Sequence, residues 1–332
     1  MKILFDAVEA HEREVLEKSL EGHALSFLGR PIGKDESLPD TDIVSVFVAS
    51  QLSRVTLDSM PSLKCIATRS TGYDHIDRSA YERGVTVSSV PSYGTRTVAE
   101  FAFSLILALS RKAYAAYDEL RDKGTADIQR YEGFDLAGKT IGIVGTGKIG
   151  KNAARIARGF DMRVILCDMY PDNTFAGEIG SGYESLEKTV ALSDIVSLHV
   201  PYRKETHHLI NENVLRQFKE GSYLINTARG GVVDTLALVQ ALKRGQLAGA
   251  GLDVIEGERE LLDEMSLLSD VHNDITEFRT LIAAHALVDM PNVIVTPHIA
   301  FNTREAKREI LETTIENIRA CASGTPVNVV KP

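Results

Sequence analysis

The stretch TIGIVGTGKIGKNAARIA, residues 140–157, decides the fold. Apolar residues predict a buried strand at 140–144, and Gly145, Gly147 and Gly150 follow it directly, ahead of a helical pattern at 151–159. In a G-x-G-x-x-G turn the first glycine allows the tight bend, the second lets the backbone approach a pyrophosphate, and the third lets helix and strand pack closely. Free N–H groups at the helix N-terminus favour the anion. The stretch therefore predicts a dinucleotide-binding unit.

The acidic residue that such a unit needs follows the next predicted strand, at 163–167. Asp168 lies eighteen residues beyond Gly150 and can accept hydrogen bonds from both ribose hydroxyls. Its charge would repel the 2′-phosphate of NADP, and Met169 and Tyr170 after it offer no cation to hold that phosphate. The predicted cofactor is therefore NAD. The alternative is a tight turn without a nucleotide and a carboxylate that is merely solvated.

The same alternation of strands and helices runs through the whole chain of 332 residues. We expect strands at 2–5, 42–48, 63–68, 84–87, 195–198, 222–226, 248–253 and 293–295, and helices at 10–19, 97–113 and 303–322. This order is typical of parallel sheets covered by helices. We predict an α/β fold with two doubly wound, Rossmann-like domains: a substrate-binding (catalytic) domain of residues 1–96 plus 300–332, and an NAD-binding domain of residues 97–299. The active site is expected in the cleft between them.

Composition excludes several classes of protein. Lys and Arg number 37 against 46 Asp and Glu, a net charge of −9 that argues against a broad nucleic-acid surface. No signal peptide is evident, and the longest apolar run, at 98–109, is too short to cross a membrane. Cys65, Cys167 and Cys321 are far apart and have no metal-ligand spacing, so we expect three reduced thiols, no metal site and a cytoplasmic location.

Three later strands end in residues that suit the reduction of a 2-keto acid. Arg229 follows the strand at 222–226, Glu256 and Glu258 follow the strand at 248–253, and His298 follows the strand at 293–295. An arginine fork binds a carboxylate, a histidine donates a proton near neutral pH, and a neighbouring carboxylate stabilises the protonated imidazole. Each residue alone is more typical of a structural role. Their joint placement behind a dinucleotide motif favours catalysis.

The chain resembles the D-isomer-specific 2-hydroxyacid dehydrogenase family over nearly its whole length. The segments that carry the resemblance are STGYDHID at 70–77, VPSYGTRTVAE at 90–100, GKTIGIVGTGKIG at 138–150, HVPYRKETHHLIN at 199–211, INTARGGVVD at 225–234, AGLDVIEGE at 250–258 and NVIVTPHIAF at 292–301. The resemblance implies that Arg229 binds the substrate carboxylate and carbonyl, that Glu258 pairs with His298, and that His298 is the acid and base. Glu258 rather than Glu256 lies five residues after Asp253, as in the family, so we expect Glu256 to be solvated.

The resemblance also implies binding residues. The backbone N–H groups of Thr71 and Gly72 are expected to hold the substrate carboxylate, and Asp253 to face the nicotinamide carboxamide. Cofactor contacts are implied for the glycine loop with Lys148 and Ile149, and for Thr97, Asp168, Val200, Pro201, Thr206, Thr227, Ala228, Asp253 and Ala300. A homodimer built through the apolar helix near 98–113 is implied as well.

Within the family the chain is most similar to the D-lactate dehydrogenase branch. Tyr93 and Phe301 would form bulky walls that leave room for a methyl group, so pyruvate is the expected substrate; the alternative is that both rings belong to the core. Other activities stay open: reduction of hydroxypyruvate, glyoxylate or a branched keto acid, a phosphite dehydrogenase, or an NADH-sensing corepressor that is not an enzyme. His207, His208 and Arg96 have no role that their spacing assigns.

Overall fold

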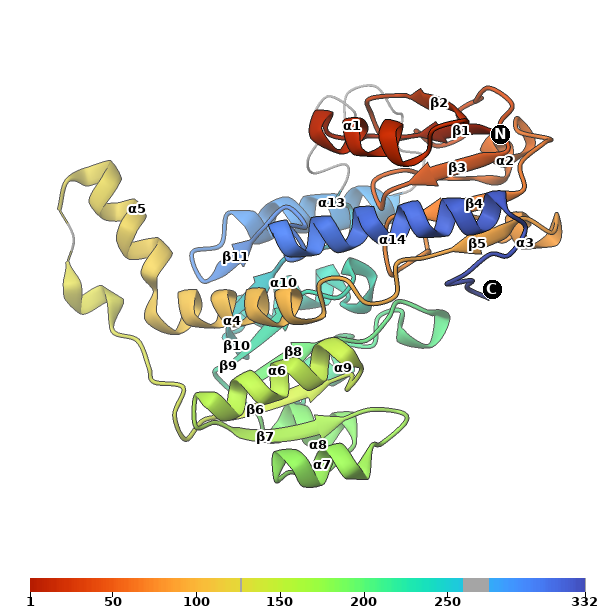
Figure 1. Cartoon of the computed structure of the whole chain (residues 1–332). Coiled ribbons are helices and arrows are strands. Elements are labelled where there is room, and N and C mark those ends of the chain that lie inside the picture. The colour runs from red at the N-terminus through yellow and green to blue at the C-terminus, as the bar shows by residue number, and fades with distance from the viewer. Residues whose placement is uncertain (126, 259–274, 332) are drawn as a thin grey trace. The chain divides into compact units, whose positions relative to one another are not determined.

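The computed structural model describes residues 1–125, 127–258 and 275–331. Contacts divide the chain into two compact units, Met1–Tyr93 with Asn302–Pro332, and Gly94–Phe301. No helix in the described ranges is long and apolar enough to span a bilayer. We describe the two units separately (Figure 1).

The first unit contains a five-stranded parallel sheet with the order β2-β1-β3-β4-β5. Leu16 of one helix and Ile315 and Ile318 of another pack on one face, while Leu57 and Ala80 pack on the other. The elements are β1 (Lys2–Phe5), β2 (Ala24–Phe27), β3 (Ile43–Val46), β4 (Cys65–Thr68), β5 (Thr86–Ser88), α1 (Ala10–Ser19), α2 (Arg54–Asp58), α3 (Ser79–Glu82) and α14 (Arg304–Ala322).

The second unit contains a six-stranded parallel sheet with the order β11-β10-β9-β8-β6-β7. The strand order reverses between β6 and β8, and ligands of open α/β sheets bind at such a switch point. Its strands are β6 (Thr140–Val144), β7 (Arg163–Cys167), β8 (Ile195–Leu198), β9 (Ser222–Asn226), β10 (Leu247–Leu252) and β11 (Val293–Val295). Its helices are α4 (Thr95–Arg111), α5 (Ala113–Lys123), η1 (Ile128–Tyr131), α6 (Lys148–Gly159), α7 (Asn173–Ile179), α8 (Leu186–Leu192), η2 (Lys204–Thr206), α9 (Glu212–Leu215), η3 (Gly230–Val232), α10 (Thr235–Lys243) and α13 (Ile275–Val288).

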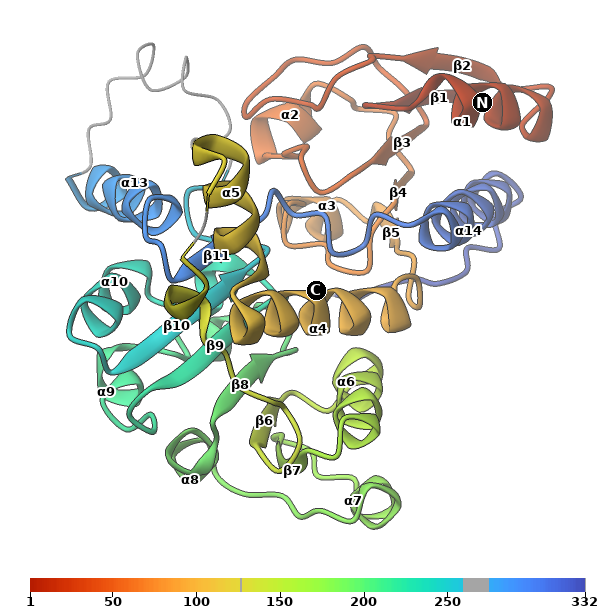
Figure 2. The ribbon, with the colours of Figure 1, turned by 90° about the vertical axis from the view of Figure 1, so that its left-hand side faces the viewer.

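Helices cover both faces of this second sheet (Figure 2). One face packs against α4, α6 and α7, and the other against α8, α9, α10 and α13. The small residues of β10 (LAGAGL) let α4 approach closely, because a Cβ at Gly251 would lie 3.0 Å from Leu105 Cβ. The prediction of two doubly wound parallel sheets is confirmed.

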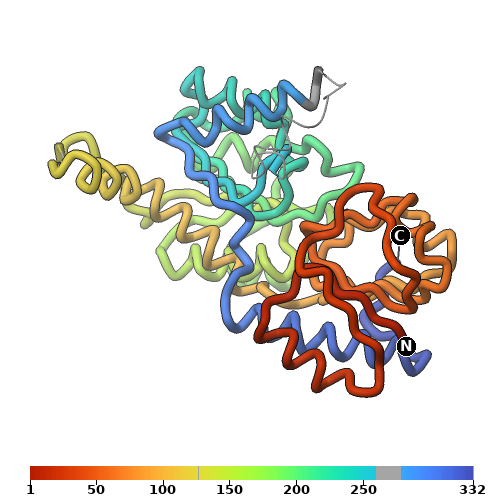
Figure 3. The backbone as a smooth tube through the Cα atoms, turned by 90° about the horizontal axis from the view of Figure 1, so that it is seen from above, coloured from red at the N-terminus to blue at the C-terminus, as the bar shows by residue number. Residues whose placement is uncertain are grey.

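Local details differ from the predictions where the sequence signal is weak. Strand β2 was not predicted, because it is a four-residue edge strand with alternating exposed residues. Helix α6 begins at Lys148 and not at residue 151, so Gly150 belongs to its first turn. Helix α5, which has no buried residue, extends away from the other helices of its unit (Figure 3).

The prediction of three reduced thiols is wrong. Cys65 of β4 and Cys321 of α14 form a disulfide with Cα atoms 6.5 Å apart. The tail helix α14 packs against β4 and thereby joins two cysteines that are 256 residues apart in the sequence. Spacing along the chain could not reveal such a pair. Cys167 is a free thiol, and burial raises its pKa to about 11.

Candidate active site

The glycine loop lies at the switch point between β6 and β8. Gly145 has a φ of +95°, and a Cβ there would lie 2.7 Å from the carbonyl oxygen of His199, directly after β8. A Cβ at Gly150 would lie 1.9 Å from the Gly145 oxygen, so the third glycine is required for the close packing. Gly147 directly precedes α6, and a Cβ at this position would have no other atom within 4 Å. The loop therefore fits a bound pyrophosphate.

Asp168 is held beside this loop at the end of β7. Its Oδ2 accepts hydrogen bonds from the Thr146 backbone N–H at 2.6 Å and from the Thr146 hydroxyl at 3.0 Å. Its Oδ1 accepts one from the Tyr170 backbone N–H at 2.8 Å. The side chains of Met169 and Tyr170 are exposed and uncharged. This carboxylate lies beside the glycine loop, at the place where the acidic residue of a dinucleotide-binding unit contacts the ribose, and it favours NAD over NADP.

The other predicted cofactor residues of this unit follow the carboxyl ends of neighbouring parallel strands or begin a helix. They are Lys148 and Ile149 in the first turn of α6, Val200, Pro201 and Thr206 after β8, Thr227 and Ala228 after β9, Asp253 after β10, Ala300 after β11, and Thr97 in the first turn of α4. Parallel strands end at one edge of the sheet, so the strand-end residues share that edge. The Thr227 hydroxyl is buried and has no hydrogen-bond partner among the described residues, which suits a group that bonds to a ligand.

Arg229 lies in the turn after β9. Asn226 holds this turn, because its Nδ2 donates to the Arg229 carbonyl at 3.0 Å and its Oδ1 accepts from the Ala228 N–H at 3.0 Å. Gly230 is needed next, since a Cβ there would lie 2.3 Å from the backbone of Ile255 beyond β10. The half-buried guanidinium donates to the Ala228 carbonyl at 2.8 Å. Strand β9 thus sets the position of the arginine through a tightly packed turn.

His298 and Glu258 meet although 40 residues separate them. His298 Nδ1 lies 3.0 Å from Glu258 Oε1, and the two side chains are 25% and 23% exposed. Both side chains are therefore partly shielded from water, which strengthens their interaction with each other, and partly accessible to a ligand. Because Nδ1 faces the carboxylate, Nε2 is the ring nitrogen left to donate a proton to a substrate. The ring of Phe301 lies edge-on to the imidazole, with centroids 6.4 Å apart.

Asp253 holds the turn that carries His298. Its carboxylate accepts hydrogen bonds from the Thr296 hydroxyl at 2.6 Å and from the backbone N–H groups of Ile299 at 2.9 Å and Ala300 at 2.8 Å. Its carbonyl accepts from the His298 N–H at 3.0 Å. Burial raises the pKa of Asp253 above its ordinary value, although the three hydrogen bonds and His298 act to lower it. The sequence reasoning assigned Asp253 to the cofactor and missed this positioning role.

The predicted substrate residues Thr71, Gly72 and Tyr93 lie in the first unit. Thr71 and Gly72 follow β4; the Thr71 hydroxyl donates to the Val90 carbonyl at 2.8 Å, and the Gly72 carbonyl accepts from the Ser70 hydroxyl at 2.6 Å. Neither backbone N–H donates a hydrogen bond within the described part of the chain. This turn therefore offers two free donors to an anion. Tyr93 is half-buried.

Glu256 is not solvated as predicted. Its side chain is 19% exposed and bonds to His208 Nε2 at 2.7 Å, while its other oxygen accepts from the backbone N–H and the hydroxyl of Thr235. Residues 259–274, which follow Glu258, lie outside the described residues.

Comparison with known proteins decides the family. Residues 103–300 match the model of the D-isomer specific 2-hydroxyacid dehydrogenase, NAD binding domain. The chain belongs to the D-isomer-specific 2-hydroxyacid dehydrogenase family. As a member of this family it is an NAD-dependent D-2-hydroxyacid dehydrogenase, which agrees with the fit of the glycine loop and Asp168 to the dinucleotide.

Individual relatives of this dehydrogenase carry different names. The D-lactate dehydrogenase of Escherichia coli is 37% identical over 85% of this chain and 84% of its own length. The glyoxylate reductase of Korarchaeum cryptofilum is 36% identical over 89% of this chain and 84% of its own length. The crystal structure of D-lactate dehydrogenase from Aquifex aeolicus, complexed with NAD and lactic acid, matches with a TM-score of 0.88 and 35% identity, covering 97% of this chain and 96% of that one.

Proposed function

We propose that this dehydrogenase reduces pyruvate to D-lactate. The observation that carries the proposal is the His298–Glu258 pair with the Phe301 ring beside it. A large aromatic ring next to the proton donor leaves space for a small substituent such as a methyl group. The similarity to D-lactate dehydrogenases supports the same substrate.

In the proposed mechanism the protein residues bind, orient and protonate the keto acid. Arg229 binds its carboxylate and polarises its keto oxygen through the guanidinium fork, and the N–H groups of Thr71 and Gly72 bind the carboxylate as well. NADH, when bound, supplies the hydride. His298 gives its proton to the keto oxygen, and Glu258 stabilises the protonated imidazole beforehand.

The second candidate substrate is glyoxylate. It is favoured by the similarity to a glyoxylate reductase at nearly the same identity as to the D-lactate enzyme. Glyoxylate carries hydrogen where pyruvate carries methyl, so a site that admits pyruvate also admits glyoxylate on size alone. Pyruvate can bury its methyl group against the protein, whereas glyoxylate has no such group. Burying one methyl group is worth about 0.8 kcal/mol, so kcat/KM for pyruvate should be roughly fourfold higher.

Initial rates of NADH oxidation with pyruvate, glyoxylate, hydroxypyruvate, oxaloacetate, phenylpyruvate and 2-ketoisocaproate test the proposal, with NADPH as the cofactor control. The expected result is the highest kcat/KM for pyruvate with NADH and a product of D configuration. A preference for glyoxylate selects the second candidate. A preference for the larger acids contradicts the walls assigned to Tyr93 and Phe301. Tight NADH binding without turnover of any acid contradicts keto-acid reduction altogether and favours phosphite oxidation or NADH sensing.

We further propose a homodimer built through α4 and α5. Helix α5 buries none of its residues, yet Tyr114, Tyr117 and Leu120 are large apolar side chains with more than half of their surface exposed. Such a patch is typical of a protein interface. Light scattering should give twice the chain mass for the wild type, and Leu120→Glu should shift it toward a monomer. A monomeric wild type contradicts this proposal.

The proposed location is the cytoplasm. The expectation of three reduced thiols no longer supports this location, because Cys65 and Cys321 form a disulfide and disulfides are rare in cytosolic proteins. Cell fractionation should place the NADH-dependent activity with a cytoplasmic marker enzyme. Activity that separates from that marker contradicts the location.

A further inference from the structure

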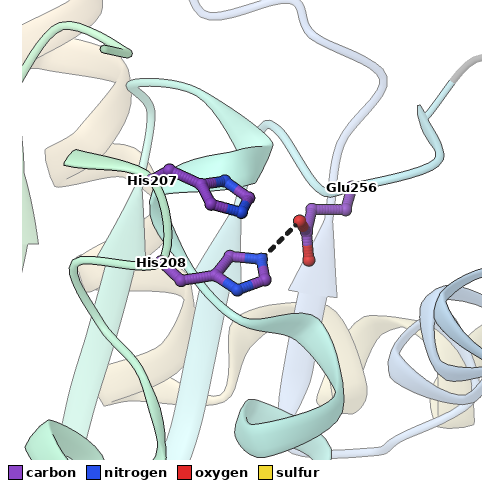
Figure 4. Close-up of side chains that lie close together, drawn as sticks. All are labelled: His207, His208 and Glu256. Atoms are coloured by element: carbon purple, nitrogen blue, oxygen red, sulfur yellow. Dashed lines mark hydrogen bonds and ion pairs between the residues drawn. The ribbon is translucent and has the colours of Figure 1, made fainter. Parts of the chain in front are cut away.

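A group of three side chains in the second unit gathers the ligand types of a transition-metal site. His207, His208 and Glu256 each offer one ligand atom, and these atoms lie within 4.8 Å of one another (Figure 4). Two imidazole nitrogens and one carboxylate oxygen form a ligand set found in catalytic zinc sites, where water occupies the remaining position. We propose that these three residues bind a divalent transition-metal ion of the Zn²⁺ class. The proposal replaces the expectation of no metal site and does not depend on the keto-acid substrate.

The backbone brings the two neighbouring imidazoles to one side. The Leu209 N–H donates to the Thr206 carbonyl at 3.2 Å and closes a turn with His207 and His208 at its centre. His207 has a φ of −62° and a ψ of 124°, and His208 has a φ of +49°. A turn of this kind favours glycine at the position of His208. In an extended chain the two rings would point to opposite sides, whereas here their centroids lie 3.9 Å apart.

Outer hydrogen bonds orient the ligands. Tyr202 OH lies 3.1 Å from His207 Nδ1, which leaves Nε2 as the ring nitrogen available to an ion. Thr235 donates from its backbone N–H at 3.1 Å and from its hydroxyl at 2.9 Å to Glu256 Oε2, so that Oε1 faces His208. Such partners, which fix the tautomer of a histidine and the direction of a carboxylate, are typical of metal sites. A surface cluster formed by chance does not require them.

The site can open enough to admit an ion. His207 is exposed, so its ring can rotate away from the ring of His208. Its Nε2 can then point toward the same position as the ligand atoms of His208 and Glu256. Glu256 and His208 are 19% and 34% exposed, and water can complete the coordination. The ion would tie the segment after β8 to the segment after β10. The turn after β9 lies next to both, because the His208 N–H donates to the Gly231 carbonyl at 2.8 Å and a Cβ at Gly230 would lie 2.6 Å from the Glu256 nitrogen.

The test is a direct binding measurement on the full chain after removal of metals with a chelator. Isothermal titration with Zn²⁺ and the absorption spectrum with Co²⁺ should both give one ion per chain. His207→Ala should weaken binding about tenfold or more, because it removes a ligand but no buried contact. The matched control is His11→Ala: His11 is also exposed and lies 3.4 Å from a carboxylate, that of Glu9, and should bind as the wild type does.

Two further readouts separate this site from other possibilities. Zn²⁺ should raise the Tm of the wild type by about 2–4 °C and leave that of His207→Ala unchanged. His298→Gln should still bind the ion. No binding by the wild type, equal affinity of wild type and His207→Ala, or loss of binding in His298→Gln alone each overturns the proposal; the last result would place the ion at the His298–Glu258 pair instead.

Discussion

Two histidine–glutamate pairs in the same unit share their chemistry and differ in their surroundings. His298 Nδ1 lies 3.0 Å from Glu258 Oε1, and His208 Nε2 lies 2.7 Å from Glu256 Oε1. Both histidines have positive φ values, +54° and +49°. Glu256, however, is fixed by two hydrogen bonds from Thr235 and faces a second imidazole, that of His207. At His298 it is the backbone of the histidine turn that is held, by Asp253.

The difference teaches that a histidine–carboxylate pair has no function of its own. Where the carboxylate is immobilised and the imidazoles cluster, the pair suits an ion. Where the histidine turn is immobilised and an aromatic ring lies beside it, the pair suits proton transfer to a small substrate. Four changes test this contrast, from the largest expected change in free energy to the smallest.

Replacing His298 by Gln should have the largest effect. The amide cannot deliver a proton, so kcat for keto-acid reduction should fall about 10²–10⁴-fold, which corresponds to roughly 3–5 kcal/mol of transition-state stabilisation. NADH affinity, measured by fluorescence titration, should stay within about twofold. The same change at His208 should lower kcat far less. Equal losses at the two positions would contradict the contrast.

A third histidine, His199, shows how a ring behaves when its hydrogen bond goes to a hydroxyl. Its Nε2 lies 3.0 Å from Ser197 Oγ, and burial lowers its pKa to about 4. The unfolded chain, with a pKa near 6.5, takes up the proton first as the pH falls. The stability that His199 contributes is therefore present above about pH 6.5 and is lost as the pH drops toward 4.

Urea unfolding of wild type and His199→Gln at pH 7 and pH 4.5 measures this contribution. Between the two pH values the free energy of unfolding of the wild type should fall by about 2–3 kcal/mol more than that of the variant. An equal fall in both proteins would mean that the ring already carries a proton in the folded state.

The sequence was sufficient for the nucleotide-binding part because its signals are local. Strand β6, the glycines and Asp168 lie within 29 residues, and each is required by sterics or charge. The start of α6 was missed because glycine is a poor helix former, although Gly150 belongs to its first turn. The Cys65–Cys321 disulfide and the His208–Glu256 bond, 256 and 48 residues apart, depend on how the elements pack, and no spacing along the chain reveals them.

Asp253→Asn breaks the support of the histidine turn without touching the imidazole. An amide nitrogen cannot accept the N–H of Ile299 or Ala300, so a buried donor loses its partner at a cost of about 1–2 kcal/mol in the free energy of unfolding. The loosened turn should lower kcat about tenfold. A turn held by other contacts would give lower stability with unchanged kcat. Asp253→Glu, which keeps the charge, should recover part of the activity.

Glu258→Gln should have the smallest total effect, a loss of about tenfold in kcat or roughly 1.4 kcal/mol. The glutamine can still accept a hydrogen bond from Nδ1, so the orientation of the ring is kept, but a neutral amide no longer favours the protonated imidazole. Steady-state rates of keto-acid reduction with NADH measure this loss. A variant with the kcat of the wild type would mean that Glu258 only orients the ring, as Thr235 orients Glu256, and the two pairs would then differ less than their surroundings suggest.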